Sequence, residues 1–80
     1  MPFFLLQHQH SPHECDAAFA AWQGFHSPLR HRRVPSSCLA GDHGVWWRVE
    51  AADRGEALAL LPPFVAERTT PIPVREVQIP

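Results

Sequence analysis

The 80-residue sequence predicts one α+β domain over residues 1–80, with its elements in the order β-α-β-β-α-β. Two capping boxes, at Ser11–Glu14 and Asp53–Glu56, indicate the starts of two helices. Apolar and polar residues alternate over Val45–Ala51, which is typical of a strand. This element order is the ferredoxin-like pattern. We therefore expect a four-stranded antiparallel sheet of order 4-1-3-2 with two helices on one face.

The first strand is expected at residues 3–10, where an apolar run becomes polar without a helix start signal. Side chains alternate between the two faces of a strand, so the even-numbered residues share one face. That face begins with Phe4 and Leu6 and ends with His8 and His10. The strand therefore carries a hydrophobic half and a histidine half on the same side.

The first helix is expected to begin after the N-cap Ser11 and to extend through Gln23. Pro12 occupies the first helical position, where a proline is well tolerated, and Gly24 is a typical helix stop. Cys15 belongs to the apolar stripe of this helix and should point inward from its first turn.

A hairpin is expected in the middle of the chain. Residues 25–35 contain two prolines and the basic run Arg30–Arg33, a composition typical of a connecting loop. Residues 36–40 and 45–51 are the predicted second and third strands, joined by a glycine-containing turn at residues 41–44.

Two helical segments and a last strand are expected in the second half of the domain. A helix is expected at residues 53–61, where the capping box opens it and two consecutive prolines end it. A short helical turn is expected at residues 64–68, since a proline is tolerated at the first helical position. The last strand is expected at residues 72–79. Prolines in and beside it place it at a sheet edge, because they cannot donate a backbone hydrogen bond.

The composition narrows the classes of function. The formal net charge is −1, all seven basic side chains are arginines, and the charges are dispersed. This pattern argues against binding to nucleic acid or to a membrane surface. The apolar start lacks the basic flank of a signal peptide, so we expect a cytoplasmic protein with reduced thiols.

Histidines and cysteines should gather at one edge of the predicted sheet. The end of the first strand, the start of the first helix and the turn into the third strand all lie there in a ferredoxin-like fold. The residues brought to this edge are His8, His10, His13, Cys15 and His43, with Cys38 reached from the second strand.

We predict a transition-metal site in this group. Two imidazoles on one strand face lie close enough to reach one ion, and an inward thiolate can join them. The expected ligands are His8, His10, Cys15 and Cys38, with His13 or His43 as substitutes. Imidazole and thiolate donors suit nickel, zinc or copper. Two other interpretations stay open: a purely structural role in the core, and a disulfide or redox pair between the two cysteines.

A resemblance supports a dimer. Residues 3–10, 46–51 and 74–77 resemble short ferredoxin-like proteins of uncharacterised function that pair into dimeric α/β barrels. Within that group, the chain is loosely similar to a family of small nickel-binding proteins. Trp46 and Trp47 should point to opposite faces of their strand, so both sheet faces need covering. We expect a homodimer formed through the face that the helices leave open.

Two functions of different class compete on this basis. The first is a homodimeric transition-metal-binding protein. The second is a dimeric α/β-barrel enzyme that acts on a small organic molecule with a histidine as general base. They differ in one requirement: a metal site needs three or more convergent donors, whereas the enzyme needs a histidine that lines a substrate-sized pocket. The Arg30–Arg33 loop is either a solvated connection or an anion-binding element.

Overall fold

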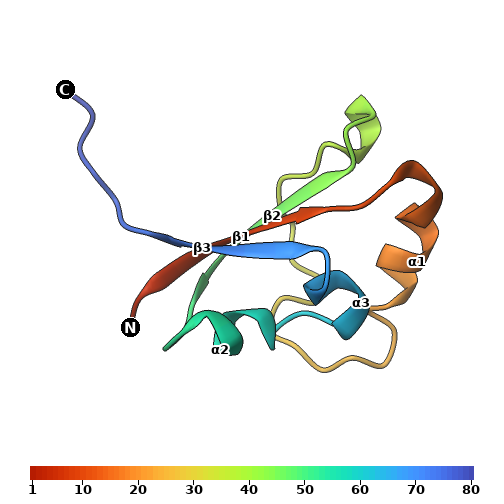
Figure 1. Ribbon diagram of the computed structural model, residues 1–80, viewed down its shortest axis with the longest axis horizontal. Coiled ribbons are helices and arrows are strands. Elements are labelled where there is room, and N and C mark those ends of the chain that lie inside the picture. The colour runs from red at the N-terminus through yellow and green to blue at the C-terminus, as the bar shows by residue number, and fades with distance from the viewer.

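Three antiparallel strands form the single sheet of the computed structural model, which describes residues 1–80, in the order β2-β1-β3 (Figure 1). The strands are β1 (Phe3–Gln9), β2 (Gly44–Glu50) and β3 (Thr69–Val74). The helices are α1 (Cys15–Ala20), α2 (Arg54–Leu58) and α3 (Pro63–Ala66), with 3₁₀ turns at Pro12–Glu14 and Cys38–Ala40. None of the helices has the length and apolar character needed to cross a membrane.

The prediction of a four-stranded ferredoxin-like sheet is wrong, because residues 36–40 do not form a strand. Their pairing with β2 is limited to one bridge, between Ser36 and Val45. The segment lacks β-branched and aromatic residues, and its serines bond to nearby backbone instead, which competes with sheet pairing. Ser37 accepts a hydrogen bond from the backbone N–H of Gly44 at 2.8 Å through its hydroxyl. The chain then turns through Gly41 in the left-handed region, at φ 88°.

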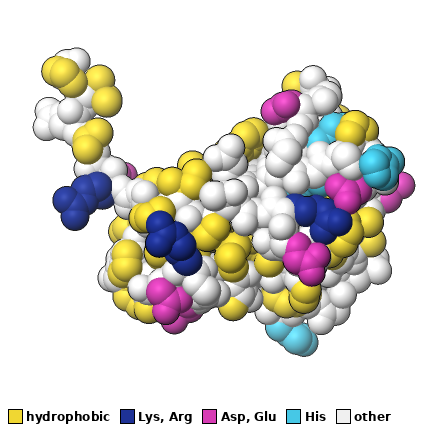
Figure 2. Space-filling model, viewed as in Figure 1, with side chains coloured by type: hydrophobic (Ala, Val, Ile, Leu, Met, Phe, Trp, Pro, Cys, Tyr) yellow, Lys and Arg dark blue, Asp and Glu magenta, His cyan; other side chains and the backbone are white.

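The last strand is also displaced from its predicted position. β3 ends at Val74, which pairs with Phe3, the first residue of β1. Residues beyond Val74 therefore have no strand to pair with, and they leave the body of the protein as an extended tail (Figure 2). The backbone nitrogens of Pro71 and Pro73, which carry no hydrogen, face the outer edge of β3, where no strand pairs with them. This agrees with the expected edge position.

The helices begin where the capping boxes predict, but they are short. Glu14 accepts a hydrogen bond from the backbone N–H of Ser11 at 3.0 Å, and Asp53 accepts one from the N–H of Glu56 at 2.8 Å. The helix expected through Gln23 instead runs as a 3₁₀ turn, α1 and further turns that end at Gly24, whose φ is 75°. Short helices of this kind depend on packing for their stability.

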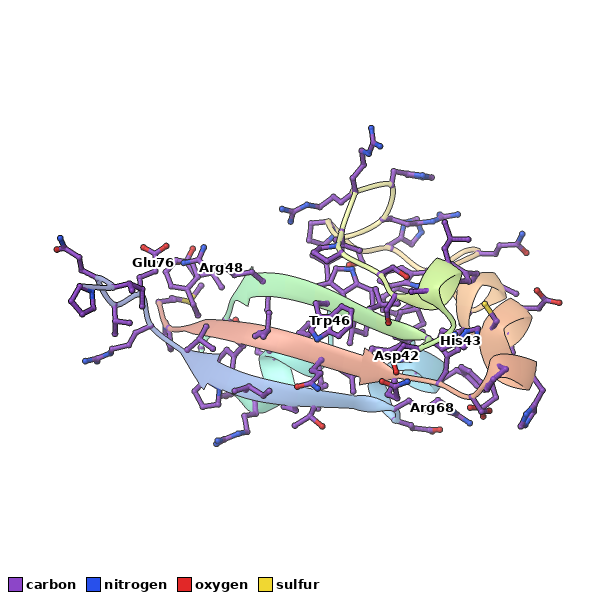
Figure 3. All side chains as sticks on the ribbon, turned by 90° about the horizontal axis from the view of Figure 1, so that it is seen from above. Asp42, His43, Trp46, Arg48, Arg68 and Glu76 are labelled. Atoms are coloured by element: carbon purple, nitrogen blue, oxygen red, sulfur yellow. The ribbon has the colours of Figure 1, made fainter.

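One face of the sheet carries the hydrophobic core. Figure 1 shows α2 and α3 below the sheet, and Figure 3 looks onto the opposite, open face with these helices behind it. The buried face presents the even-numbered residues of β1 and the odd-numbered residues of β2, against side chains from the helices and the loop at residues 25–35. The core comprises Phe4, Leu6, Leu29, Val45, Trp47, Val49, Ala51, Ala57, Leu61 and Val65.

An ion pair fastens the start of α1 to the start of β3. Arg68 donates two hydrogen bonds to Oε2 of Glu14, from Nε at 3.1 Å and from a terminal nitrogen at 2.8 Å. These bonds, with those from Ser11, lower the pKa of the Glu14 carboxyl to about 2. The contact joins residues that are distant in the sequence, and it lies directly beside Cys15.

We expect Glu14→Gln to lower the free energy of unfolding in a pH-dependent way. Because the pKa of Glu14 is depressed in the folded protein, its contribution is fully present above about pH 4.5 and declines as the pH falls towards about 2. Urea unfolding across this pH range should show that the free energies of unfolding of the wild type and the variant converge at low pH. Glu67→Gln is the matched control, since Glu67 is a more distant partner of Arg68 at 3.6 Å and is largely exposed. If the free energies of unfolding of wild type and Glu14→Gln differed by the same amount at every pH, the depressed pKa of Glu14 would be contradicted.

Candidate metal centre

Four donor side chains converge at the end of the sheet where β1 ends and β2 begins. His10, Cys15, Cys38 and His43 each place one ligand atom so that all four atoms lie within 4.8 Å of one another. His10 is buried, and the other three side chains are partly buried. The donors come from four separate segments: the end of β1, the first turn of α1, the 3₁₀ turn at residues 38–40, and the turn before β2. Such a group has the donor number and type of a structural zinc site.

The donors are organised as two pairs with mirrored spacing. Residues 11–14 separate His10 from Cys15, and residues 39–42 separate Cys38 from His43. The capping-box turn folds the first pair together, and the turn through Gly41 folds the second. The β1–β2 register then joins the pairs, because the backbone N–H of His10 donates to the carbonyl oxygen of His43 at 3.2 Å.

His43 has two features expected of a ligand. Its Nδ1 is buried and has no hydrogen-bond partner, which is costly for a polar atom unless something else satisfies it. Its backbone adopts φ 56°, a left-handed conformation that non-glycine residues rarely take. Strained residues of this kind persist where the surrounding structure holds them and cluster at functional sites.

His8 lies outside the four-donor group, and it orients His10 instead. Nε2 of His8 contacts Nδ1 of His10 at 2.9 Å, and Nδ1 of His8 contacts the carbonyl oxygen of Val65 at 3.3 Å and the hydroxyl of Thr69 at 3.1 Å. The carbonyl of Val65 can only accept, so we assign the hydrogen of His8 to Nδ1. Nε2 of His8 must then accept from Nδ1 of His10.

This chain of hydrogen bonds leaves a lone pair on Nε2 of His10. That nitrogen lies 3.8 Å from Sγ of Cys38, on the side of the four-donor group. A metal-bound histidine usually donates its other ring N–H to a partner that fixes its tautomer and orientation. His8 is such a partner for His10, and Val65 and Thr69 in turn fix His8.

Burial favours the uncharged forms of the His10 imidazole and the Cys15 thiol, because it shifts the pKa of each group in that direction. Burial lowers the pKa of both His8 and His10, and the neighbouring histidines lower it further. Burial also raises the pKa of the Cys15 thiol, and the nearby Cys38 adds to this effect. Neutral imidazoles can coordinate a metal directly, whereas the thiols must lose their protons, which a bound cation would favour.

The structure brings together three of the four expected ligands, His10, Cys15 and Cys38. The fourth place is taken by His43, which was a substitute in the sequence interpretation. His13, the other substitute, is exposed and contacts the hydroxyl of Ser11. The signal that favoured His43 was the mirrored spacing of the two His/Cys pairs, which sequence reasoning did not use.

Comparison of the chain with protein-family models, with curated proteins and with solved structures gives no match. The chemistry of the site therefore rests on its own geometry.

Replacing His8 by Phe should weaken metal binding about 10–100-fold, the usual effect of losing a partner that orients a ligand. Phenylalanine keeps an aromatic ring in this buried position but cannot accept the hydrogen bond from His10. Thr69→Val should weaken binding less, because the Val65 carbonyl still holds His8. The matched control is Thr70→Val, since Thr70 is exposed on the opposite face. Competition titration with a chromogenic chelator measures each affinity, and an unchanged affinity in His8→Phe would contradict the proposed chain.

Proposed function

We propose that this protein binds one zinc ion per chain through His10, Cys15, Cys38 and His43, and that the ion acts as a structural crosslink. The observation that carries the proposal is the convergence of four soft or borderline donors, from four segments, within 4.8 Å. Clusters of exposed acidic residues often occur without a metal ion. This group differs from them, because it contains no carboxylate and the ring of His10 is buried.

The donor set favours zinc among the candidate metals. Two thiolates and two imidazoles in tetrahedral geometry are characteristic of zinc, whereas nickel(II) and copper(II) prefer square-planar or tetragonal nitrogen and oxygen sites. Bond lengths of about 2.0–2.1 Å to nitrogen and 2.3 Å to sulfur imply a tetrahedral N···S edge of roughly 3.6 Å. The separation of 3.8 Å between Nε2 of His10 and Sγ of Cys38 is close to this edge. The remaining donors need to move inward by about 1 Å or less.

The need for a crosslink follows from the small core. The structure buries 15 of its 80 residues, and its longest α-helix spans six residues. Domains of this size commonly need a metal, a disulfide or a partner chain to remain folded. A bound ion would hold α1 and the 38–43 segment, neither of which belongs to the sheet, against the ends of β1 and β2.

The enzyme alternative has weaker support. It requires a histidine held at a substrate-sized pocket, and the histidine that lines the larger cavity is His31. This side chain is exposed and makes no hydrogen bond that would orient its ring. A catalytic zinc site would keep one coordination position open, whereas four protein donors fill all four.

We expect protein purified without a histidine tag to contain one zinc ion per chain. Elemental analysis gives the stoichiometry, and removal of the metal by a chelator should lower the melting temperature or unfold the chain. His10→Ala, Cys15→Ser, Cys38→Ser and His43→Ala should each abolish stoichiometric binding.

His13→Ala is the matched control, because His13 lies on the same turn but outside the four-donor group. It should retain full binding. Nickel or copper in place of zinc in the protein as purified would contradict the choice of metal. Failure of all three metals to bind would contradict the site.

We also propose that two copies associate through the open face of the sheet. Phe3, Leu5, Trp46 and Ile72 lie on this face and are only partly buried in the single chain (Figure 3). The accessible surface is 5588 Å², whereas a monomeric protein of this length exposes about 4,900 Å². The tail contributes to this excess, since residues 75–80 are all exposed. Burying an apolar face against its own copy is a common solution for small domains.

Light scattering should report a dimer at micromolar concentration. The double variant Leu5→Glu, Ile72→Glu should be a monomer, because both negative charges would be buried in the dimer interface. Val77→Glu is the control, since Val77 lies on the tail and is 73% exposed. A monomeric wild type would contradict the dimer without affecting the metal site.

A further inference from the structure

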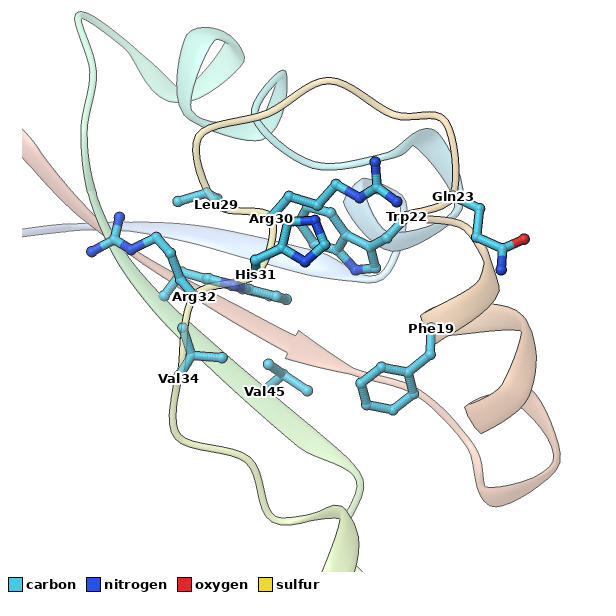
Figure 4. A pocket seen from close by; sticks show the side chains of 10 residues that line it. Phe19, Trp22, Gln23, Leu29, Arg30, His31, Arg32, Val34 and Val45 are labelled. Carbon is cyan, nitrogen blue, oxygen red and sulfur yellow. The ribbon is translucent and has the colours of Figure 1, made fainter.

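A second site lies on the helix side of the sheet, beside the metal centre but separate from it. A cavity of about 300 Å³ opens between the end of α1 and the loop at residues 25–35 (Figure 4). None of the four candidate metal ligands lines it. Its volume is at the lower end of the range for small-molecule pockets. A ligand that filled it would be about the size of a single ring with one substituent.

The inner surface of the cavity is aromatic and apolar. Trp22 and Trp47 line it with ring centroids 5.9 Å apart and planes tilted by 44°. Leu29 and Val34 add aliphatic side chains from the loop. Phe19 also lines the cavity and is 56% exposed. A flat apolar group placed here would contact rings and methyl groups on several sides.

The rim of the cavity is cationic and has no counter-ion within the protein. Arg30, His31 and Arg32 line it, and no acidic residue does (Figure 4). The ion pairs of the protein involve Arg48, Arg68 and the N-terminus, so neither Arg30 nor Arg32 is neutralised by a carboxylate. An arginine fork matches the geometry of a carboxylate and binds it with two parallel hydrogen bonds.

The rim is also held in place by the fold. The side chain of Leu29 is buried in the core, and the hydroxyl of Ser27 donates to the carbonyl oxygen of Leu60 at 2.7 Å. His31, between the two arginines, has φ 67°, and it and His43 are the two non-glycine residues of the chain in the left-handed region. Arg30 and Arg32, the two neighbours of His31, both line the cavity.

We infer that this cavity binds a small aromatic carboxylate, with the ring on Trp22 and Trp47 and the carboxylate on either Arg30 or Arg32, whose guanidinium groups lie on opposite sides of the cavity (Figure 4). The apolar interior selects the ring, and the unpaired guanidinium groups select the negative charge. The cavity is a preformed site that needs no zinc ligand, so this inference is independent of the proposed metal function. It also assigns a role to the basic run: Arg30 and Arg32 serve the cavity, whereas Arg33 does not line it.

The test uses benzoate as the probe and the protein in its purified, metal-loaded form. In ¹H–¹⁵N spectra, benzoate should shift the indole signals of Trp22 and Trp47 in a saturable way. Trp46 lies on the open face of the sheet and provides an internal control that should not move. Benzamide, which has the ring without the charge, and acetate, which has the charge without the ring, should each bind roughly tenfold to a hundredfold more weakly.

Arg30→Gln with Arg32→Gln should reduce the affinity for benzoate by a similar factor, whereas Arg33→Gln should leave it unchanged. In each variant without benzoate, a Trp46 indole signal at its wild-type position shows that the protein remains folded. Equal binding of benzoate and benzamide, or an equal loss in Arg33→Gln, would overturn the inference. Absence of a saturable shift at Trp22 and Trp47 in folded wild-type protein would also overturn it.

Discussion

The antiparallel register of β1 and β2 is the constraint on which the rest of this structure depends. It pairs Gln9 with Gly44, so the end of one strand meets the start of the other, and His10 follows directly beside His43. Because strand side chains alternate with a period of two, a slip of one residue would turn the buried face of β1 to solvent. The hydrophobic core and the candidate metal centre are therefore fixed by the same pairing.

Along one face of β1, the side chains change from hydrophobic core residues to histidines. Phe4 and Leu6 belong to the core, His8 is buried at its end, and His10 enters the four-donor group. Both histidines have hydrogen-bond partners: His8 contacts Val65 and Thr69, and His10 contacts His8. Buried polar networks of this kind contribute to stability only when every member has a partner. The unpartnered Nδ1 of His43 is the exception here, and a bound cation would remove it.

The sequence was informative where local chemistry determines local structure. The capping box at Ser11–Glu14 predicted the turn that carries Cys15, and alternation predicted the shared face of His8 and His10. It was misleading at residues 36–40, where the segment lacks β-branched and aromatic residues and its serine hydroxyls bond to nearby backbone. Ser37 bonds to Gly44 and ends the hairpin after one bridge, which moves Cys38 from a strand into a 3₁₀ turn. His43 could be predicted only as a substitute ligand, because its place as the fourth donor depends on a left-handed backbone at that residue, which the sequence pattern does not specify.

In the proposed site, two cysteines and two histidines from four segments bind one ion. X-ray absorption at the zinc edge, on protein purified with its metal, tests this claim most directly because it counts the ligand atoms by type and distance. We expect two sulfur atoms at about 2.3 Å and two nitrogen atoms at about 2.0–2.1 Å from the zinc ion. A first shell with fewer than two sulfur atoms, or one made up of nitrogen and oxygen alone, would contradict it.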